Sequence, residues 1–220
     1  MRLAVLISGA GSNMVAIARA CQQGRIPAQI AVVISDRADA GGLERARELG
    51  LPAALVDRQR FRGSGRVDKE AFEAELESVL GQHGAEVLIL AGFMSILSGG
   101  FVSRHAGRIL NIHPSLLPRY PGLDTHARAL AAGDELHGAS VHFVTPELDG
   151  GPLVVQAPVA VLPGDDVNSL SARVHAQEHI IYPMSISWLA TRRLQWNDGA
   201  PTLDGLPLRT PVQHHPVPHA

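Results

Sequence analysis

The sequence lacks a second cysteine, an excess of charge of either sign and a long hydrophobic run. Cys21 is the only cysteine among 220 residues, so no disulfide can form within the chain, and a reducing cytoplasm is the expected compartment. Nineteen basic and 21 acidic side chains argue against broad electrostatic binding of nucleic acid. The apolar run at residues 3–7 is ended by Gly9 and Gly11, well short of a signal sequence or a membrane span. We therefore expect a soluble cytoplasmic protein that binds neither nucleic acid nor membranes.

Two nucleotide-binding motifs are missing from the glycine-rich segment 8–13, Ser-Gly-Ala-Gly-Ser-Asn. It lacks the Gly-Lys-Ser/Thr ending of a P-loop, and Met14 stands where the dinucleotide fingerprint has its third glycine. Backbone N–H groups at the start of a helix can still bind an anion, and Asp36 lies at roughly the right distance for a ribose contact. A nucleotide-binding regulatory module is therefore one alternative function, and a plain turn between strand and helix is the simplest interpretation.

Apolar strands alternate with helical patterns, which predicts an α/β fold with a doubly wound, largely parallel sheet, Rossmann-like in its arrangement. Continuous apolar runs predict strands at residues 3–7, 31–34, 53–56, 87–90, 108–112, 139–144 and 153–161. Helical spacing predicts helices through Met14 and Cys21, and over residues 43–49, 68–82 and 125–132. A long last helix begins after Asp165 or Asp166 as N-cap and should kink or end at Pro183.

The length suits one domain, which we place at residues 1–208. Residues 57–67 contain four arginines and predict a mobile basic loop, and residues 193–208 predict a small hairpin. Residues 209–220 are rich in proline and histidine and are expected to be disordered. Their histidines fit a solvated tail, with binding of stray metal ions as the alternative; they are His214, His215 and His219.

Residues 111–122, Asn-Ile-His-Pro-Ser-Leu-Leu-Pro-Arg-Tyr-Pro-Gly, follow the expected end of a buried strand. The two-residue alternation of a strand points the side chains of Asn111 and His113 to the same face, and Pro114 ends the strand pairing. Open α/β sheets bind ligands at the carboxyl ends of their strands. An amide beside an imidazole at such an end predicts a site, whereas a solvated histidine before a proline-rich turn is the plainer interpretation.

Five motifs, in order along the chain, resemble those of the folate-dependent formyltransferases. The resemblance covers about residues 2–208 and is nearest to the members that act on phosphoribosylglycinamide. Residues 111–118 look like the core motif, 8–13 like the substrate-phosphate loop, 91–97 like the folate-pocket turn, 137–151 like the loop with the catalytic aspartate, and 177–179 like the region that contacts the ribose.

The resemblance implies transfer of a formyl group from the co-substrate 10-formyltetrahydrofolate to the amine of phosphoribosylglycinamide, in purine synthesis. No metal is required, since the formyl carbon is already activated. The implied partners are these small molecules, and the implied state is a monomer or homodimer. Asn111 would donate to the oxygen that becomes an alkoxide, His113 would carry protons, and Asp149 would stabilise the imidazolium and order a water.

Binding residues are also implied by the resemblance. Gly11, Ser12 and Asn13 would bind the phosphate. His175 and Glu178 would contact the ribose; they lie three apart and share a helix face, where a surface pair is the default interpretation. The folate pocket would be formed by Lys69, Met94, Ser95, Ile96, Leu97 and Thr145. His142 fits either a hydrogen-bonded core histidine or a site residue.

Three positions depart from the family pattern. Ser95 stands where many members have arginine, which removes one expected folate contact, and Lys69 stands where arginine is common. Asp124 replaces a frequent histidine near the core motif. We expect Asp124 to be a helix N-cap, because a second carboxylate beside Asp149 would weaken its pairing with His113.

One other branch of the family is an alternative, and a second is not expected. A formyltetrahydrofolate hydrolase would use the same catalytic residues with water as acceptor, and its relatives carry an N-terminal regulatory domain that we do not expect here. The tRNA-directed members carry an extra C-terminal domain, for which the chain has no evident room.

Overall fold

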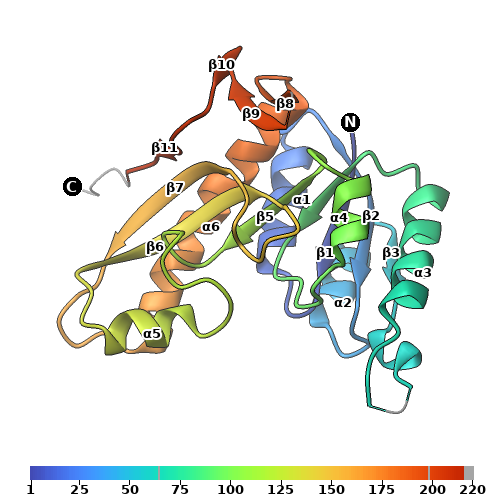
Figure 1. The fold of residues 1–220 in the computed structure, drawn as a ribbon, viewed down its shortest axis with the longest axis horizontal. Coiled ribbons are helices and arrows are strands. Elements are labelled where there is room, and N and C mark those ends of the chain that lie inside the picture. Colours follow the sequence, from blue (N-terminus) through green and yellow to red (C-terminus); the bar gives the residue numbers. More distant parts are fainter. Residues whose placement is uncertain (64, 198, 216–220) are drawn as a thin grey trace. The chain divides into compact units, whose positions relative to one another are not determined.

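The computed structural model describes residues 1–63, 65–197 and 199–215. It divides into two compact units, the first ending at Leu110 and the second beginning at Asn111. Strand β5 (Ile109–His113) carries the chain from one unit into the other. Figure 1 shows the helices and strands with their labels.

Parallel strands form the sheet of the first unit, in the order β4 (Val87–Leu90), β1 (Arg2–Ile7), β2 (Gln29–Ser35) and β3 (Ala53–Leu55). Residues 3–7 are fully buried, as a strand covered on both faces requires. The helices of this unit are α1 (Ser12–Gln22), α2 (Gly41–Glu48), the 3-10 turn η1 (Arg58–Phe61), α3 (Lys69–Gln82) and α4 (Gly99–Arg104).

An antiparallel hairpin is the centre of the second unit, where β6 (Leu136–Phe143) pairs with β7 (Leu153–Ala160). The strand order is β11 (Val212–Gln213), β7, β6 and β5. Helix α5 (Thr125–Ala131) precedes the hairpin, and the long helix α6 (Val167–Ala190) packs on β6 and β7 (Figure 1). A separate antiparallel sheet is formed by β8 (Leu194–Asn197), β9 (Ala200–Leu203) and β10 (Leu206–Pro207).

The predicted fold class is confirmed, since the strands are mostly parallel and alternate with helices. Helix starts follow the expected chemistry: the Asp68 carboxylate accepts a hydrogen bond from Ala71 N at 3.0 Å, and Asp166 forms a capping box with Ser169. Asp166, rather than Asp165, is therefore the N-cap of α6. None of the described helices is long and apolar enough to span a membrane.

Several local predictions are wrong. Helix α6 does not end at Pro183 and continues to Ala190, because the apolar side chains on both sides of the proline remain buried and their packing outweighs a local cost of about 3 kcal/mol. Helix α4 was not predicted, and η1 gives regular structure to part of the basic segment.

The C-terminal segment also differs from its prediction. The predicted hairpin is present as β8 paired antiparallel with β9, and β10 adds a third strand that was not predicted. Val212 and Gln213 are not disordered, because they pair in parallel with β7. His219 lies outside the described residues.

Candidate active site

The second unit brings the three predicted catalytic side chains together. Asn111 and His113 end β5, and the loop between β6 and β7 supplies Asp149. The Nδ1 atom of His113 lies 3.5 Å from Oδ2 of Asp149, and these two side chains are only 7% and 10% exposed. The expected same-face placement of Asn111 and His113 therefore leads to one shared cluster, which Asn111 joins through His142.

The backbone positions the carboxylate of Asp149, which also faces the imidazole of His113. Gly122 N donates to its Oδ2 at 2.8 Å. Its own backbone is left-handed, with φ of 50°. Two residues later, a Cβ on Gly151 would lie 1.8 Å from the carbonyl oxygen of Phe143, so only glycine allows the loop to return this closely to β6. The position of the carboxylate is thus imposed by the loop itself.

Acceptors face both ring nitrogens of His113. Its Nε2 atom lies 2.9 Å from the carbonyl oxygen of Tyr120, which can only accept, so Nε2 carries the hydrogen. Its Nδ1 atom faces Asp149. A doubly protonated ring would donate to both acceptors, so the surroundings suit a group that takes up a proton during a reaction.

His142 orients the amide of Asn111. Its Nδ1 atom lies 2.9 Å from the carbonyl oxygen of Phe143 and therefore donates, and burial lowers the pKa of His142, which keeps the ring neutral. The Nε2 lone pair accepts from Nδ2 of Asn111 at 3.1 Å. The second N–H of that amide is left to donate to another acceptor.

The sequence left the role of His142 open, and the structure places it in the cluster, with Nε2 3.8 Å from Oδ1 of Asp149. The pairing of β6 with β7 shifts register between Val141 and His142. The residue skipped by this shift is Val154 of β7, so alternation along β6 continues. His142 therefore shares a face with Ser140, whose hydroxyl contacts the loop after β5.

A second pair of imidazoles was missed by sequence reasoning. Nδ1 of His126 lies 3.0 Å from Nε2 of His137, and the ring of His175 is 6.5 Å from that of His126. Burial and the neighbouring imidazoles lower the pKa of His126 to about 4, and burial lowers the pKa of His137. Both rings are therefore neutral near pH 7. Among the described residues, no group of three or more histidines, cysteines or acids could hold a metal ion.

His175 and Glu178 share a face of α6, as their spacing predicts. Nε2 of His175 lies 3.9 Å from Oε2 of Glu178. The histidine is 49% exposed, whereas the glutamate is only 4% exposed, so the default interpretation as a surface pair is wrong. The pair therefore places a half-exposed imidazole beside a buried carboxylate.

The first unit contains a polar cluster of its own, formed by Ser8, Asp36 and Ser95, which we call the Asp36 cluster. Ser8 Oγ donates to Oδ1 of Asp36 and Ser95 Oγ donates to Oδ2, both at 2.6 Å. Ser8 Oγ also accepts from Met94 N at 2.7 Å. The cluster ties the ends of β1 and β2 to the turn after β4. Both oxygens of Asp36 accept a hydrogen bond and the residue is only 2% exposed, which does not favour the ribose contact of the nucleotide-binding alternative.

Two other groups of predicted binding residues belong to the first unit. Gly11 has φ of 74° and its Cβ would lie 3.0 Å from Cα of Gly42, so glycine is required where the loop meets α2. Ser12 and Asn13 begin α1, whose N-cap makes no side-chain hydrogen bond. The predicted folate-pocket residues of this unit differ in exposure. Lys69 is exposed, and Met94 and Ile96 are 54% and 63% exposed. Ser95 is buried and Leu97 is half-buried. Thr145 lies half-buried in the second unit.

Asp124 does not cap α5 with its side chain, so that prediction is wrong. It occupies the N-cap position, but its backbone is left-handed with φ of 56° and its carboxylate makes no cap hydrogen bond. A side-chain cap needs an extended backbone at this position.

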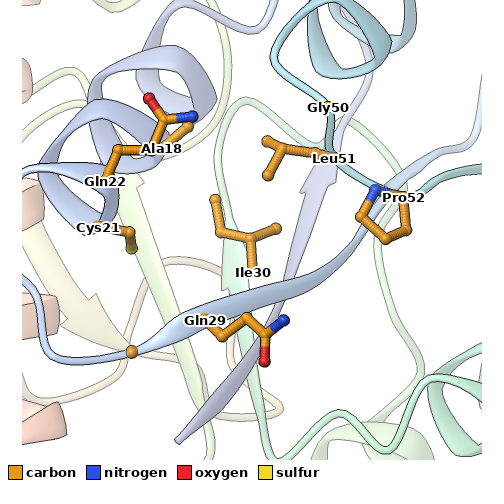
Figure 2. Close-up of a pocket in the computed structure, with 9 residues that line it drawn as sticks. Ala18, Cys21, Gln22, Gln29, Ile30, Gly50, Leu51 and Pro52 are labelled. Atoms are coloured by element: carbon orange, nitrogen blue, oxygen red, sulfur yellow. The ribbon is translucent and has the colours of Figure 1, made fainter.

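An apolar pocket of about 260 Å³ lies at the amino end of β2, away from the Asp36 cluster. Figure 2 shows side chains from the end of α1, the start of β2 and the turn before β3 lining it. Burial raises the pKa of the Cys21 thiol, so the one sulfur here is protonated at neutral pH. This pocket has no ionised group and carries no candidate chemistry.

Comparison with known proteins decides the family. The model of the formyl transferase family matches residues 1–186. The chain belongs to this family. It is 51% identical to phosphoribosylglycinamide formyltransferase of Escherichia coli (strain K12) over 93% of the chain and 94% of that protein. It is 47% identical to the Haemophilus influenzae protein of the same name over 93% of the chain and 94% of that protein.

A solved structure of the formyl transferase family agrees with the fold. Phosphoribosylglycinamide formyltransferase from Coxiella burnetii superposes with a TM-score of 0.89 at 45% identity, covering 97% of this chain and 98% of that one. The resemblance to folate-dependent formyltransferases is therefore confirmed.

Proposed function

We propose that the protein transfers the formyl group of 10-formyltetrahydrofolate to the amine of 5-phosphoribosylglycinamide, in de novo purine biosynthesis. The observation that carries the proposal is the cluster of Asn111, His113 and Asp149, in a chain 51% identical to a phosphoribosylglycinamide formyltransferase. An amide donor, an imidazole and a carboxylate are the groups that acyl transfer to an amine requires.

In the proposed reaction the amine nitrogen attacks the formyl carbon, and the carbonyl electrons move onto the oxygen. The free N–H of Asn111 donates to this oxygen while its charge develops. Because Nε2 of His113 donates to Tyr120, the ring can donate beside it only from a protonated Nδ1 that turns from Asp149 toward the oxygen. A water ordered by Asp149 carries the amine proton to N10 of the folate, and the bond between N10 and the formyl carbon breaks. Asp149 also stabilises the protonated ring of His113 while the intermediate persists.

The proposal includes binding roles for further residues. The phosphate is assigned to backbone amides at Gly11, Ser12 and Asn13, because a helix start favours an anion. The ribose is assigned to His175 and Glu178, whose buried carboxylate can accept from a hydroxyl. The folate is assigned to Lys69, Met94, Ser95, Ile96, Leu97 and Thr145. We further propose one domain over residues 1–208, a monomer or homodimer, a cytoplasmic location and no need for a metal.

Absorbance-monitored loss of the formyl group from a 10-formylfolate, with and without the glycinamide ribotide, tests the proposal. We expect loss of the formyl group only when the ribotide is present, with formylated ribotide as product. Release of formate without ribotide would instead establish the hydrolase. Binding of a nucleotide with no formyl chemistry would establish the regulatory module.

A further inference from the structure

Arg58 of the first unit lies beside the residue that replaces the family's frequent arginine. Its Nη1 donates to Oγ of Ser95 at 3.4 Å, and Ser95 Oγ donates onward to Asp36 at 2.6 Å. The side chain of Arg58 is half-buried. A guanidinium therefore stands next to position 95 although the residue at that position is a serine.

The guanidinium of Arg58 has no acidic partner among the described residues, in contrast to other arginines nearby. Arg60 pairs with Glu75 at 3.1 Å, and Arg37 pairs with Asp39 at 2.7 Å. The contact of Arg58 with Ser95 is long and uses one of five N–H groups. The remaining donors can bind an external acceptor, and their planar arrangement matches a carboxylate.

The backbone around Arg58 is fixed by three neighbours. Arg58 N donates to the carbonyl oxygen of Asp36 at 3.0 Å, and the Asp57 carboxylate accepts from Gln59 N at 2.9 Å. The side chain of Arg58 reaches Asp36 only through the hydroxyl of Ser95, so it is oriented by that acid without pairing with it. Such a preorganised cation loses little freedom when it binds an anion.

Exposed apolar side chains flank the same turn. Met94 and Ile96 are 54% and 63% exposed on either side of the buried Ser95. A cation next to exposed apolar surface suits a ligand that is aromatic or apolar at one end and carboxylated at the other. The p-aminobenzoyl ring of a folate and the glutamyl tail attached to it together have this chemistry.

We propose that Arg58 binds a carboxylate of the folate's glutamyl tail, and so supplies from η1 the guanidinium that Ser95 lacks. This inference rests on the proposed function, because the folate is that reaction's co-substrate. The ribotide phosphate is the competing anion, and the experiment separates the two.

Steady-state kinetics with two formyl donors, 10-formyltetrahydrofolate and the glutamate-free 10-formyltetrahydropteroate, test Arg58→Ala. We expect a KM for the glutamylated donor about tenfold higher than wild type, as for the loss of one charged hydrogen bond, and a kcat within twofold. With the glutamate-free donor, Arg58→Ala and wild type should not differ. Arg60→Ala, whose arginine already pairs with Glu75, is the matched control and should behave as wild type with both donors.

The double variant Arg58→Ala/Ser95→Arg restores a guanidinium at the neighbouring position. We expect it to recover the KM for the glutamylated donor to within about threefold of wild type, which a merely structural role of Arg58 would not produce. An equal loss with both donors would overturn the assignment, and a higher KM for the ribotide alone would assign Arg58 to the phosphate.

Calorimetric titration with tetrahydrofolate and tetrahydropteroate separates this inference from the proposed function. It needs no turnover, so it tests Arg58 even if wild type transfers no formyl group. Wild type should bind the glutamylated ligand more tightly, and Arg58→Ala should remove the difference. A difference that persists in the variant refutes the role of Arg58, while absent formyl transfer by wild type refutes the proposed function alone.

Discussion

Asp36 in the first unit and Asp149 in the second are both largely buried carboxylates, yet their partners are of different kinds. Asp36 accepts from two serine hydroxyls. Asp149 faces the imidazoles of His113 and His142 and accepts from one backbone amide. Serine hydroxyls stay neutral at all ordinary pH values, whereas an imidazole can bind a second proton and become a cation.

This is the difference we expect between a structural carboxylate and the one proposed to act in the reaction. Around Asp36 no partner can exchange charge, so the acid joins three chain segments and keeps them in place. In the proposed reaction, the carboxylate of Asp149 would stabilise a proton that arrives on the neighbouring imidazole of His113. Burial alone therefore does not identify a catalytic acid; the chemistry of its hydrogen-bond partners does.

The largest expected effect is on turnover, from Asp149→Asn. We expect kcat to fall at least a hundredfold, because the amide cannot stabilise a positive charge that forms only during the reaction. Asparagine tolerates the left-handed backbone at this position, so the melting temperature should stay close to that of wild type. Retention of more than a tenth of the wild-type kcat would show that Asp149 lacks the assigned role.

Asp36→Ala should act on stability instead. Removing the carboxylate leaves the hydroxyls of Ser8 and Ser95 without their acceptor, and we expect a loss of about 2–3 kcal/mol in the free energy of unfolding. Urea denaturation measures it. A variant as stable as wild type that loses turnover would place Asp36 in the chemistry and abolish the contrast with Asp149.

His142→Leu should lower kcat about tenfold, because Asn111 loses the acceptor that orients its amide. His142→Gln keeps an acceptor oxygen in the side chain and should recover part of the loss. Steady-state kinetics of both variants, with melting curves as the control for folding, check this. Equal kcat values for the two would mean that His142 only fills space.

The unfolding free energy should fall as the pH is lowered from about 6.5 to 4. In the folded protein the pKa of His126 is about 4, against 6.5 for an unperturbed histidine. Between these pH values the unfolded chain binds one proton more than the folded chain. The free energy of unfolding therefore rises with pH in this window, and the contribution of His126 is complete above about pH 6.5. His126→Gln should flatten the pH dependence of urea midpoints, while the exposed His215→Gln should leave it unchanged.

The smallest expected effect compares two aspartates at helix starts. Asp124→Asn should alter the unfolding free energy by less than ~0.5 kcal/mol and kcat by less than twofold, because its carboxylate makes no cap hydrogen bond and asparagine tolerates the left-handed backbone. Asp166→Ala, which removes the capping box of α6, should cost about 1 kcal/mol. Thermal melts measure both changes. A large fall in kcat for Asp124→Asn, with an unchanged melting temperature, would assign Asp124 to the active site.

Much of the fold follows from local patterns in the sequence. The strand at residues 87–90 was predicted to the residue, because four consecutive apolar side chains permit little else in a parallel sheet. Helix α4 was not predicted from the sequence because it is short and begins with two glycines, which have low helix propensity. The path of α6 through Pro183 depends on tertiary packing, which a local rule does not contain.

The candidate site was predictable only in part. Strand alternation alone places Asn111 and His113 together, whereas the role of Asp149 came from the family resemblance. The contact of His142 with Asn111 depends on β6 lying next to β5 in the sheet, which alternation along one strand does not reveal. The Asp36 cluster joins residues 8, 36 and 95, and only the assembled sheet reveals that these segments meet. Arg58 was predicted only as part of a basic loop.

The hydrogen bond from Nδ1 of His142 to the carbonyl oxygen of Phe143 makes this ring a reporter for nuclear magnetic resonance. The two neutral tautomers of histidine differ in their ¹⁵N chemical shifts, so the ring nitrogens have a defined signature. Nε2 meets the same amide of Asn111 that is proposed to face the formyl oxygen. A ligand that accepts a hydrogen bond from this amide should change the Nε2 chemical shift of His142. Binding at the site can then be followed without a label on the ligand.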